Sequence, residues 1–99
     1  MRVIAKRTLR QFWERPGRED AELPLKAWHA LAQAAAWSSP ADIKAQFRSA
    51  SLLGGNRVVF NIAGNKYRLV ARIDYRHHIL FVRFVGTHGD YDRIDAETI

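Results

Sequence analysis

Apolar residues recur along this chain with two spacings, and the change between them separates a helical part from a sheet-forming part. Over Ala21–Trp37 they return every three or four residues, for example at Leu25, Trp28 and Leu31, which predicts an amphipathic helix. The alanines in that range favour the same structure. The pair Gly54-Gly55 breaks the pattern, and beyond it apolar residues occupy every second position. We therefore expect helices in the first half of the chain and strands in the second.

Shorter elements are predicted on either side of this helix. They are a strand over residues 2–5, a helix over 8–15, and a helical turn or two from Ser39 towards Phe47. Thr8 is the expected N-cap of the helix over 8–15, which Pro16-Gly17 ends. Ser39 as N-cap and Pro40 at the first position begin the later helical turn. The strand has β-branched residues, so we expect it to join the edge of a sheet made later in the chain.

Alternation with a period of two predicts a three-stranded antiparallel meander in the second half. Its strands start at Arg57, after a turn at 63–65, and after a turn at 75–78, and the last one covers Ile79–Val85. The residues expected to face the helices are Val58, Phe60, Ile62, Tyr67, Leu69, Ala71 and Ile73. The fold class is therefore α+β: one small domain over residues 1–99, with an N-terminal strand, two to three helices and a C-terminal antiparallel sheet.

The charge of the chain bounds the kind of partner it has. The 16 lysines and arginines exceed the 10 acidic residues, which makes the formal net charge +6. Such a balance favours nucleic acid or an acidic protein, although small basic domains also carry it as solvated surface. Cysteine is absent, which excludes disulfides and thiolate sites. No apolar run approaches the roughly 20 residues that span a bilayer, and the start does not resemble a signal peptide. We expect a cytoplasmic protein without a membrane partner.

Basic residues gather on the predicted outer face of the strands. Lys66, Arg68 and Arg72 form a row that can touch successive phosphates, and Arg83 from the next strand extends it. Arg57 and Arg76 add to the same basic surface. The alternative is the ordinary polar side of a half-exposed sheet. Because few acids share this face, the row favours a polyanion such as RNA.

His88 is the best candidate for chemistry, because it follows the Gly86-Thr87 break at the end of a buried strand. An imidazole exchanges protons near neutral pH, although a lone loop histidine is more often a surface residue. Tyr91 follows three residues later and either stacks on a base or packs against the sheet edge. Asn61 is the outward polar residue nearest the row, but asparagine near a turn usually serves the backbone.

Other chemistries fit the sequence poorly. No set of histidines and carboxylates has the spacing of metal ligands, and Gly54-Gly55 is not followed by the lysine and serine of a phosphate-binding loop. His77 and His78 adjoin one another in a turn, so their side chains point apart, and we interpret them as solvated. We expect neither a metal nor another cofactor.

Two stretches together resemble a known family. They are VVFNIAGNKYRLVARIDY at Val58–Tyr75 and FVRFVGTHGDYDRID at Phe81–Asp95. The pattern F-N-I-x-G-N-K-Y-R-L, followed by G-T-H-x-x-Y-D, is similar to HigB-type toxins of bacterial toxin-antitoxin systems, members of the wider RelE-like group. The stretch RVIAKRTLRQFWE at 2–14 adds to the likeness, as does ADIKAQF at 41–47.

The resemblance implies a RelE-like fold and an endoribonuclease that cleaves mRNA, typically on the translating ribosome, and that a HigA-type antitoxin silences. It implies Asn61, Lys66 and Arg68 at the scissile phosphate, His88 as the proton-transfer residue and Tyr91 as support for the substrate. The alternative is a non-catalytic RNA-binding or regulatory module, in which the basic row grips phosphates without breaking bonds.

Overall fold

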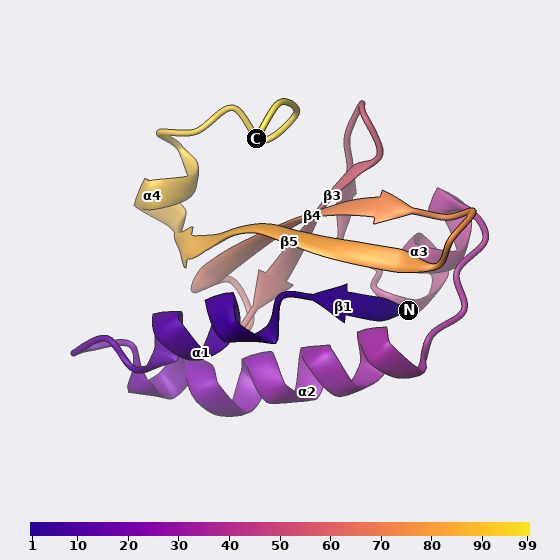
Figure 1. Cartoon of the computed structure of the whole chain (residues 1–99). Helices are drawn as coiled ribbons and strands as arrows, with labels where there is room; N and C mark the ends of the chain where they lie inside the picture. The colour runs from indigo at the N-terminus through magenta and orange to yellow at the C-terminus, as the bar shows by residue number, and fades with distance from the viewer.

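The computed structural model describes residues 1–99 and places a curved sheet above helices from the first half of the chain (Figure 1). In chain order the elements are β1 (Arg2–Ile4), α1 (Lys6–Trp13), the 3-10 helix η1 (Glu19–Ala21), α2 (Glu22–Ala34), α3 (Pro40–Gln46), β2 (Ser51–Leu52), β3 (Arg57–Ile62), β4 (Tyr67–Asp74), β5 (Ile79–Thr87) and α4 (His88–Tyr91). The predicted α+β class is confirmed. None of the helices has the length and apolar character that a membrane-crossing segment needs.

The sheet has five strands in the order β1-β5-β4-β3-β2. The predicted meander of β3, β4 and β5 is confirmed, and all of its pairings are antiparallel. β1 lies at the edge, as expected, and runs parallel to β5. The other edge strand, β2, is only two residues long, and both residues are exposed. It was not predicted. Parallel strands need a long connection. Here the chain between β1 and β5 forms α1 to α3 and the other three strands.

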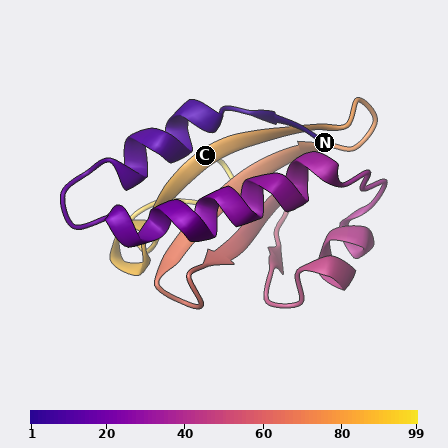
Figure 2. The ribbon, with the colours of Figure 1, turned by 90° about the horizontal axis from the view of Figure 1, so that it is seen from below.

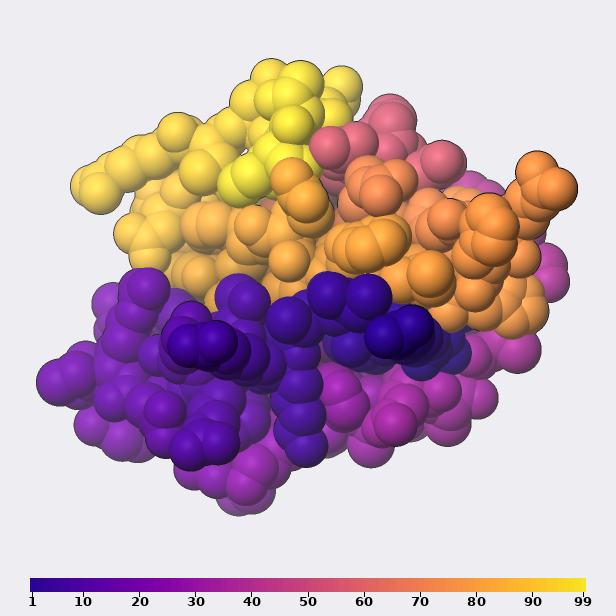
Figure 3. All heavy atoms as spheres, in the orientation of Figure 1, coloured from indigo at the N-terminus to yellow at the C-terminus, as the bar shows by residue number.

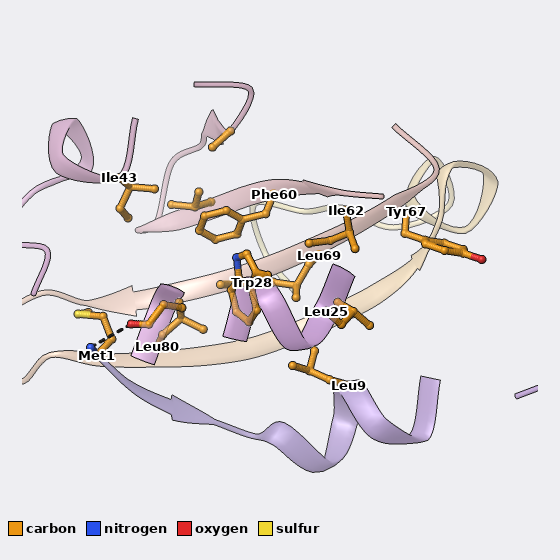
Figure 4. Close-up of a cluster of buried hydrophobic side chains, with 14 of the residues drawn as sticks. Met1, Leu9, Leu25, Trp28, Ile43, Phe60, Ile62, Tyr67, Leu69 and Leu80 are labelled. Carbon is orange, nitrogen blue, oxygen red and sulfur yellow. Dashed lines mark hydrogen bonds between the residues drawn. The ribbon is translucent and has the colours of Figure 1, made fainter. Parts of the chain in front are cut away.

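The helices cover one face of the sheet because its strands present apolar residues there. Figure 2 shows α2 running across the strands, with α1 on one side of it and α3 on the other. All seven residues predicted to face the helices are buried. Phe60 is central, since its ring contacts those of Trp28, Trp37 and Phe47 with centroids 5.3, 6.2 and 5.1 Å away. Figure 4 shows several of these side chains converging between α2 and the strands. The core therefore fixes which face of each strand points outward.

Two helix starts differ from the predicted ones. Ala5 is the N-cap of α1, so Thr8 lies inside the helix and the prediction of a Thr8 cap was wrong. The helix expected over Ala21–Trp37 is regular from Glu22 to Ala34, with η1 in front of it. Ser39 is the N-cap residue of α3, as predicted, with Pro40 at its first position. At the start of α3, the Asp42 carboxylate accepts the N–H of Ser38 at 2.8 Å.

The opposite face of the sheet is covered only in part. Val59 and Val70 are buried there together with Ala96, and the side chain of Tyr91 packs against this cluster. Residues after α4 therefore lie on the strands, as Figure 3 shows where the yellow C-terminal part sits over the sheet on the side away from α1 and α2. At the start of β4 and the end of β5, the element that packs against the strands is α4.

Candidate active site

A row of three residues crosses the sheet where β4 begins. The strand register pairs Asn61 with Arg68, and Arg68 with Gly86. Arg68 lies between Tyr67 and Leu69, which are buried against the helices, so its side chain stands on the opposite face. The row is thus placed by the same alternation that builds the core.

His88 is the first residue of α4, directly after β5. Thr87 caps this helix: its hydroxyl accepts the N–H of Asp90 at 3.1 Å, and the Asp90 carboxylate accepts the N–H of Thr87 at 3.2 Å. These bonds form a capping box. They also hold the pKa of Asp90 below its usual value, with the backbone N–H of Thr87 as the largest cause. The predicted exit loop is therefore a short capped helix, and the His88 side chain remains exposed on a fixed backbone.

The structure brings Arg68 and His88 together. Nη2 of Arg68 donates a hydrogen bond to Nε2 of His88, and Nη1 of Arg68 also donates to the carbonyl of Asn65 at 3.4 Å. A guanidinium only donates, so Nε2 must offer its lone pair in this contact. A permanent cation and an imidazole base consequently share one point at the end of the sheet.

Gly86 makes this arrangement possible because no side chain fits at its position. A Cβ on Gly86 would lie 2.6 Å from Cζ of Phe84 and 3.0 Å from Cβ of Asp90. Both contacts are shorter than ordinary van der Waals separations. A glycine here lets the Asp90 side chain of α4 and the Phe84 ring approach β5 closely.

The sequence of this site and its surroundings matches a family model. The model is that of HigB toxin, described as the RelE-like toxic component of a toxin-antitoxin system, and it matches residues 21–94. The chain belongs to this family. The predicted resemblance is thereby confirmed over a range that includes both Arg68 and His88, while the stretch at 2–14 lies outside it. No curated protein matches the chain. As the toxic component of such a system, the protein has an antitoxin as partner.

Lys66, predicted at the same phosphate as Arg68, is bound in this toxin by a residue from the helical side. Its ammonium group forms an ion pair with Asp20 of η1, whose other carboxylate oxygen accepts the hydroxyl of Tyr67 at 2.5 Å. The hydrogen bond from Lys66 is the largest cause that lowers the pKa of Asp20, and the same bond raises the pKa of Lys66. Burial, and then the bond to Asp20, raises the pKa of Tyr67. Lys66 therefore borders the site but is held from the helical side.

Asn61 and Tyr91 both contact the protein itself. The Asn61 amide donates to the carbonyl of Ser49 at 3.1 Å, as expected of an asparagine that serves the backbone. Tyr91 is half-buried against the Val59 and Val70 cluster, the packing alternative that its sequence position left open. Their predicted roles at the substrate stay predictions, since neither side chain contacts Arg68 or His88 through a hydrogen bond.

The basic residues predicted to bind RNA are divided over the surface. Arg57 and Arg72 are paired across β3 and β4, on the same face as Arg68 but beyond Val59 and Val70. The Arg72 guanidinium lies 4.7 Å from the ring centroid of Phe81. Nη2 of Arg57 donates to the carbonyl of Ile99 at 2.7 Å.

Arg83 and Arg76 extend the basic surface without joining that pair. Arg83 is left without a partner at the irregularity opposite Val70 and Ala71, and it is exposed. Arg76 is in the turn between β4 and β5, at the end of the sheet remote from His88. The predicted row is thus divided by the small apolar cluster, with Arg68 on one side of it and Arg57 and Arg72 on the other.

Asp20 and Arg18 are the residues that sequence reasoning missed. Both lie in the connection between α1 and α2, which reads as a solvated stretch of mixed charge. After the hydrogen bonds to Thr87 and the charge of Arg93, the charge of Arg18 also lowers the pKa of Asp90. Asp20 is 46 residues from its partner Lys66, and no local pattern signals such a contact. No group of three or more His, Asp or Glu side chains is placed to hold a metal ion.

Proposed function

We propose that this toxin is an endoribonuclease that cleaves mRNA without a metal ion, on the translating ribosome, and so inhibits translation and growth. The observation that carries the proposal is the contact between Arg68 and His88 at the end of the sheet. RelE-like membership supports RNase activity in general. A cation and a base at one point are the two groups that cleavage at a phosphodiester requires.

In the proposed reaction the 2′-hydroxyl of one nucleotide attacks the adjacent phosphorus. A 2′-O–P bond forms and the P–O5′ bond breaks, which gives a 2′,3′-cyclic phosphate and a free 5′-hydroxyl. In the free protein Arg68 occupies the lone pair of His88 Nε2. A bound phosphate competes for the guanidinium, so Nε2 becomes free to take the proton of the 2′-hydroxyl. The 5′ oxygen leaves as it gains a proton, which His88 is placed to return.

Arg68 and Lys66 supply positive charge where the phosphorane accumulates negative charge. Arg68 is held by the carbonyl of Asn65 as well as by His88, so its guanidinium is already oriented. Removing one such preorganised donor typically costs about 100- to 1,000-fold in rate. Positioned acid-base catalysis contributes about 100- to 10,000-fold. Two side chains can therefore account for a large share of the rate acceleration of a simple nuclease.

The test is cleavage of RNA by single-site variants with matched controls. His88→Ala and Arg68→Ala should each slow cleavage by at least about 100-fold and abolish growth arrest, while the thermal unfolding midpoint changes little. His78→Ala and Arg76→Ala are the comparison variants and should slow cleavage far less, because both residues are exposed in the turn at the other end of β5. The products should carry 2′,3′-cyclic phosphate and 5′-hydroxyl ends.

Two outcomes would contradict the proposal. If His88→Ala cleaved RNA at the wild-type rate, His88 would not transfer the proton. If the wild-type protein bound RNA in a salt-sensitive way but left it intact, the chain would be an RNA-binding module rather than an enzyme.

The ribosome enters the proposal because the site has little with which to hold an RNA strand. The Arg68 and His88 pair is open, and the other cations of this face lie beyond the Val59 and Val70 cluster. Positioning by another body can supply much of the effective concentration that such a site lacks. Message on programmed ribosomes should be cut faster than naked message of the same sequence, and equal rates would count against a ribosomal substrate.

A further inference from the structure

Asp20 connects the segment between α1 and α2 to the edge of the proposed active site. One of its carboxylate oxygens accepts the Tyr67 hydroxyl at 2.5 Å and the other binds the Lys66 ammonium group. Lys66 and Tyr67 are consecutive, so a single carboxylate fixes both a buried ring and an exposed cation at the start of β4. These contacts link Asp20, Lys66 and Tyr67, and of the three the proposed mechanism uses only Lys66.

Tyr67 provides a rigid anchor for this carboxylate. Its side chain is fully buried, and its ring meets that of Phe12 edge to face with centroids 5.2 Å apart. Figure 4 shows Tyr67 at the end of the core, with its hydroxyl pointing away from the other labelled side chains. A buried phenol usually needs a hydrogen-bond partner, and Asp20 supplies it. The position of Asp20 is therefore set by the core.

Lys66 is held by this anchored carboxylate but is not enclosed by it. The Lys66 side chain keeps 57% of its exposure and that of Asp20 keeps 47%. An ammonium group has three N–H donors, so one can bind Asp20 while the others remain available to a phosphate. A free lysine has many rotamers and loses that freedom when it binds. A lysine that is already restrained loses less conformational entropy when it binds a phosphate.

The restrained lysine lies at the same end of the sheet as Arg68 and His88, the proposed catalytic residues. Tyr67 is paired with Thr87, the residue directly before His88. Lys66 precedes Tyr67, so its backbone adjoins the start of α4. A restraint on Lys66 at this place acts on the distribution of positive charge next to Arg68 and His88.

The pair Lys26–Glu22 shows what an ordinary surface ion pair of this protein looks like. Its two atoms lie 2.5 Å apart, one turn from each other on α2, with similarly exposed side chains. The Glu22 carboxylate accepts a hydrogen bond from the exposed Lys26 side chain and, unlike Asp20, from no buried side chain. The difference between the two pairs is the Tyr67 anchor, which gives Asp20 a fixed position rather than a flexible one.

We propose that Asp20 is a positioning residue that holds Lys66 ready for the RNA phosphate, with the Tyr67 hydroxyl as its anchor. This inference rests on the proposed function, since Lys66 matters in this way only if a phosphate is bound beside it. The carboxylate does not contact the RNA. It acts through Lys66, and its removal costs turnover because the ammonium group then samples many positions.

The experiment combines single and double variants in the cleavage assay. Asp20→Asn keeps the shape and an acceptor for Tyr67 but removes the charge that holds Lys66. It should lower kcat roughly 10-fold, within the range of up to about 100-fold known for small misplacements of reacting groups, with a smaller effect on KM. In a Lys66→Ala background, Asp20→Asn should change nothing further. Glu22→Gln is the matched control and should leave the rate unchanged.

Side-chain relaxation by NMR reads the restraint without any cleavage. The Lys66 Cε methylene should be more ordered in the wild-type protein than in Asp20→Asn, while Lys26 is equally mobile in both. Equal mobility of Lys66 in the two proteins would overturn the proposal, as would an Asp20→Asn loss of the same size with and without Lys66, because that is the signature of a merely structural role. Absence of cleavage by the wild type would instead refute the proposed function, and the relaxation result would still decide the restraint.

Discussion

The two faces of the sheet are built from the same strands but are covered in different ways. The face covered by α1 and α2 packs into one cluster of 19 buried residues. This cluster includes every inward-facing residue of β3 and β4. The other face has a buried cluster of three residues, with Arg68 on one side of it and Arg57 and Arg72 on the other. Most of the buried core lies on the covered face, whereas the residues of the proposed active site lie on the open one. The covered face fixes the register, and the register alone places Arg68 beside Asn61 and Gly86.

The largest effect should come from breaking the covered face. Phe60→Ala should destabilise the protein by about 3–5 kcal/mol, because a ring surrounded by three other aromatic rings leaves a cavity that rigid neighbours cannot fill. Phe84 is the matched residue on the opposite face, where it is half-buried beside the small cluster. Phe84→Ala should cost clearly less. Denaturant unfolding of both variants measures the difference.

If Phe60→Ala and Phe84→Ala lowered the free energy of unfolding equally, the covered face would not be the main source of stability. Activity offers a second readout for the same pair of variants. Below its unfolding midpoint, Phe60→Ala should keep the catalytic rate of its folded fraction, whereas Phe84→Ala should slow cleavage, because Phe84 borders Gly86 and the start of α4.

The second effect sharpens the comparison at the site itself. Gly86→Ala would put a Cβ against the Phe84 ring and against Asp90, so one of them must move. Overpacking of this kind costs about 1–3 kcal/mol. Since Asp90 belongs to the capping box that orients His88, cleavage should also fall. Unfolding and cleavage of the same sample test both consequences.

Gly89 provides the control for this substitution. It follows His88 in α4, and a Cβ there would meet only Oγ1 of Thr87, at the ordinary distance of 3.9 Å. Gly89→Ala should therefore leave cleavage intact and stability equal or slightly higher, as expected when alanine replaces glycine in a helix. A similar loss in both variants would mean that the glycine at 86 has no special place in the site.

Much of the covered face could be predicted from the sequence because it depends on local alternation. The burial of Phe60, Tyr67 and Leu69 follows from their period of two, and that period also sends Arg68 to the other face. The short helix α4 was not predicted, since a loop was expected after Gly86-Thr87. A signal was present all the same, since Thr87 followed three residues later by Asp90 has the spacing of a capping box.

The parts that could not be predicted depend on contacts between distant segments. Asp20 reaches Lys66 only because η1 packs near the start of β4, and the residues after α4 cover Val59 and Val70 without any periodic pattern. The division of the arginines into two groups has the same origin. Alternation states which face a side chain points to, but it does not state what else lies on that face.

A smaller effect should distinguish the arginines of the open face from those outside it. Arg72→Ala should weaken RNA binding and reduce the slope of log affinity against log salt concentration by about 1, because one phosphate contact is lost. Its guanidinium is already ordered over the Phe81 ring. Arg76→Ala, in the exposed turn, should reduce the slope less. Binding is measured with His88→Ala protein so that the RNA stays intact, and equal slopes for both variants would mean that the face does not select where RNA lies.

The smallest effect concerns the pH dependence of stability at the start of α4. The pKa of Asp90 is lowered in the folded state, so the unfolded chain binds more protons and the free energy of unfolding rises with pH. The contribution of Asp90 is fully present above its unfolded pKa, about 3.9, and is lost as pH falls through the lower folded value. Asp90→Asn removes this titration. The stability difference between wild type and Asp90→Asn should therefore shrink steadily when unfolding is measured from pH 6 down towards pH 2. A difference that stayed constant would mean that the hydrogen bonds to Thr87 do not depend on the carboxylate charge. The position of His88 would then depend only on the packing of α4 against β5.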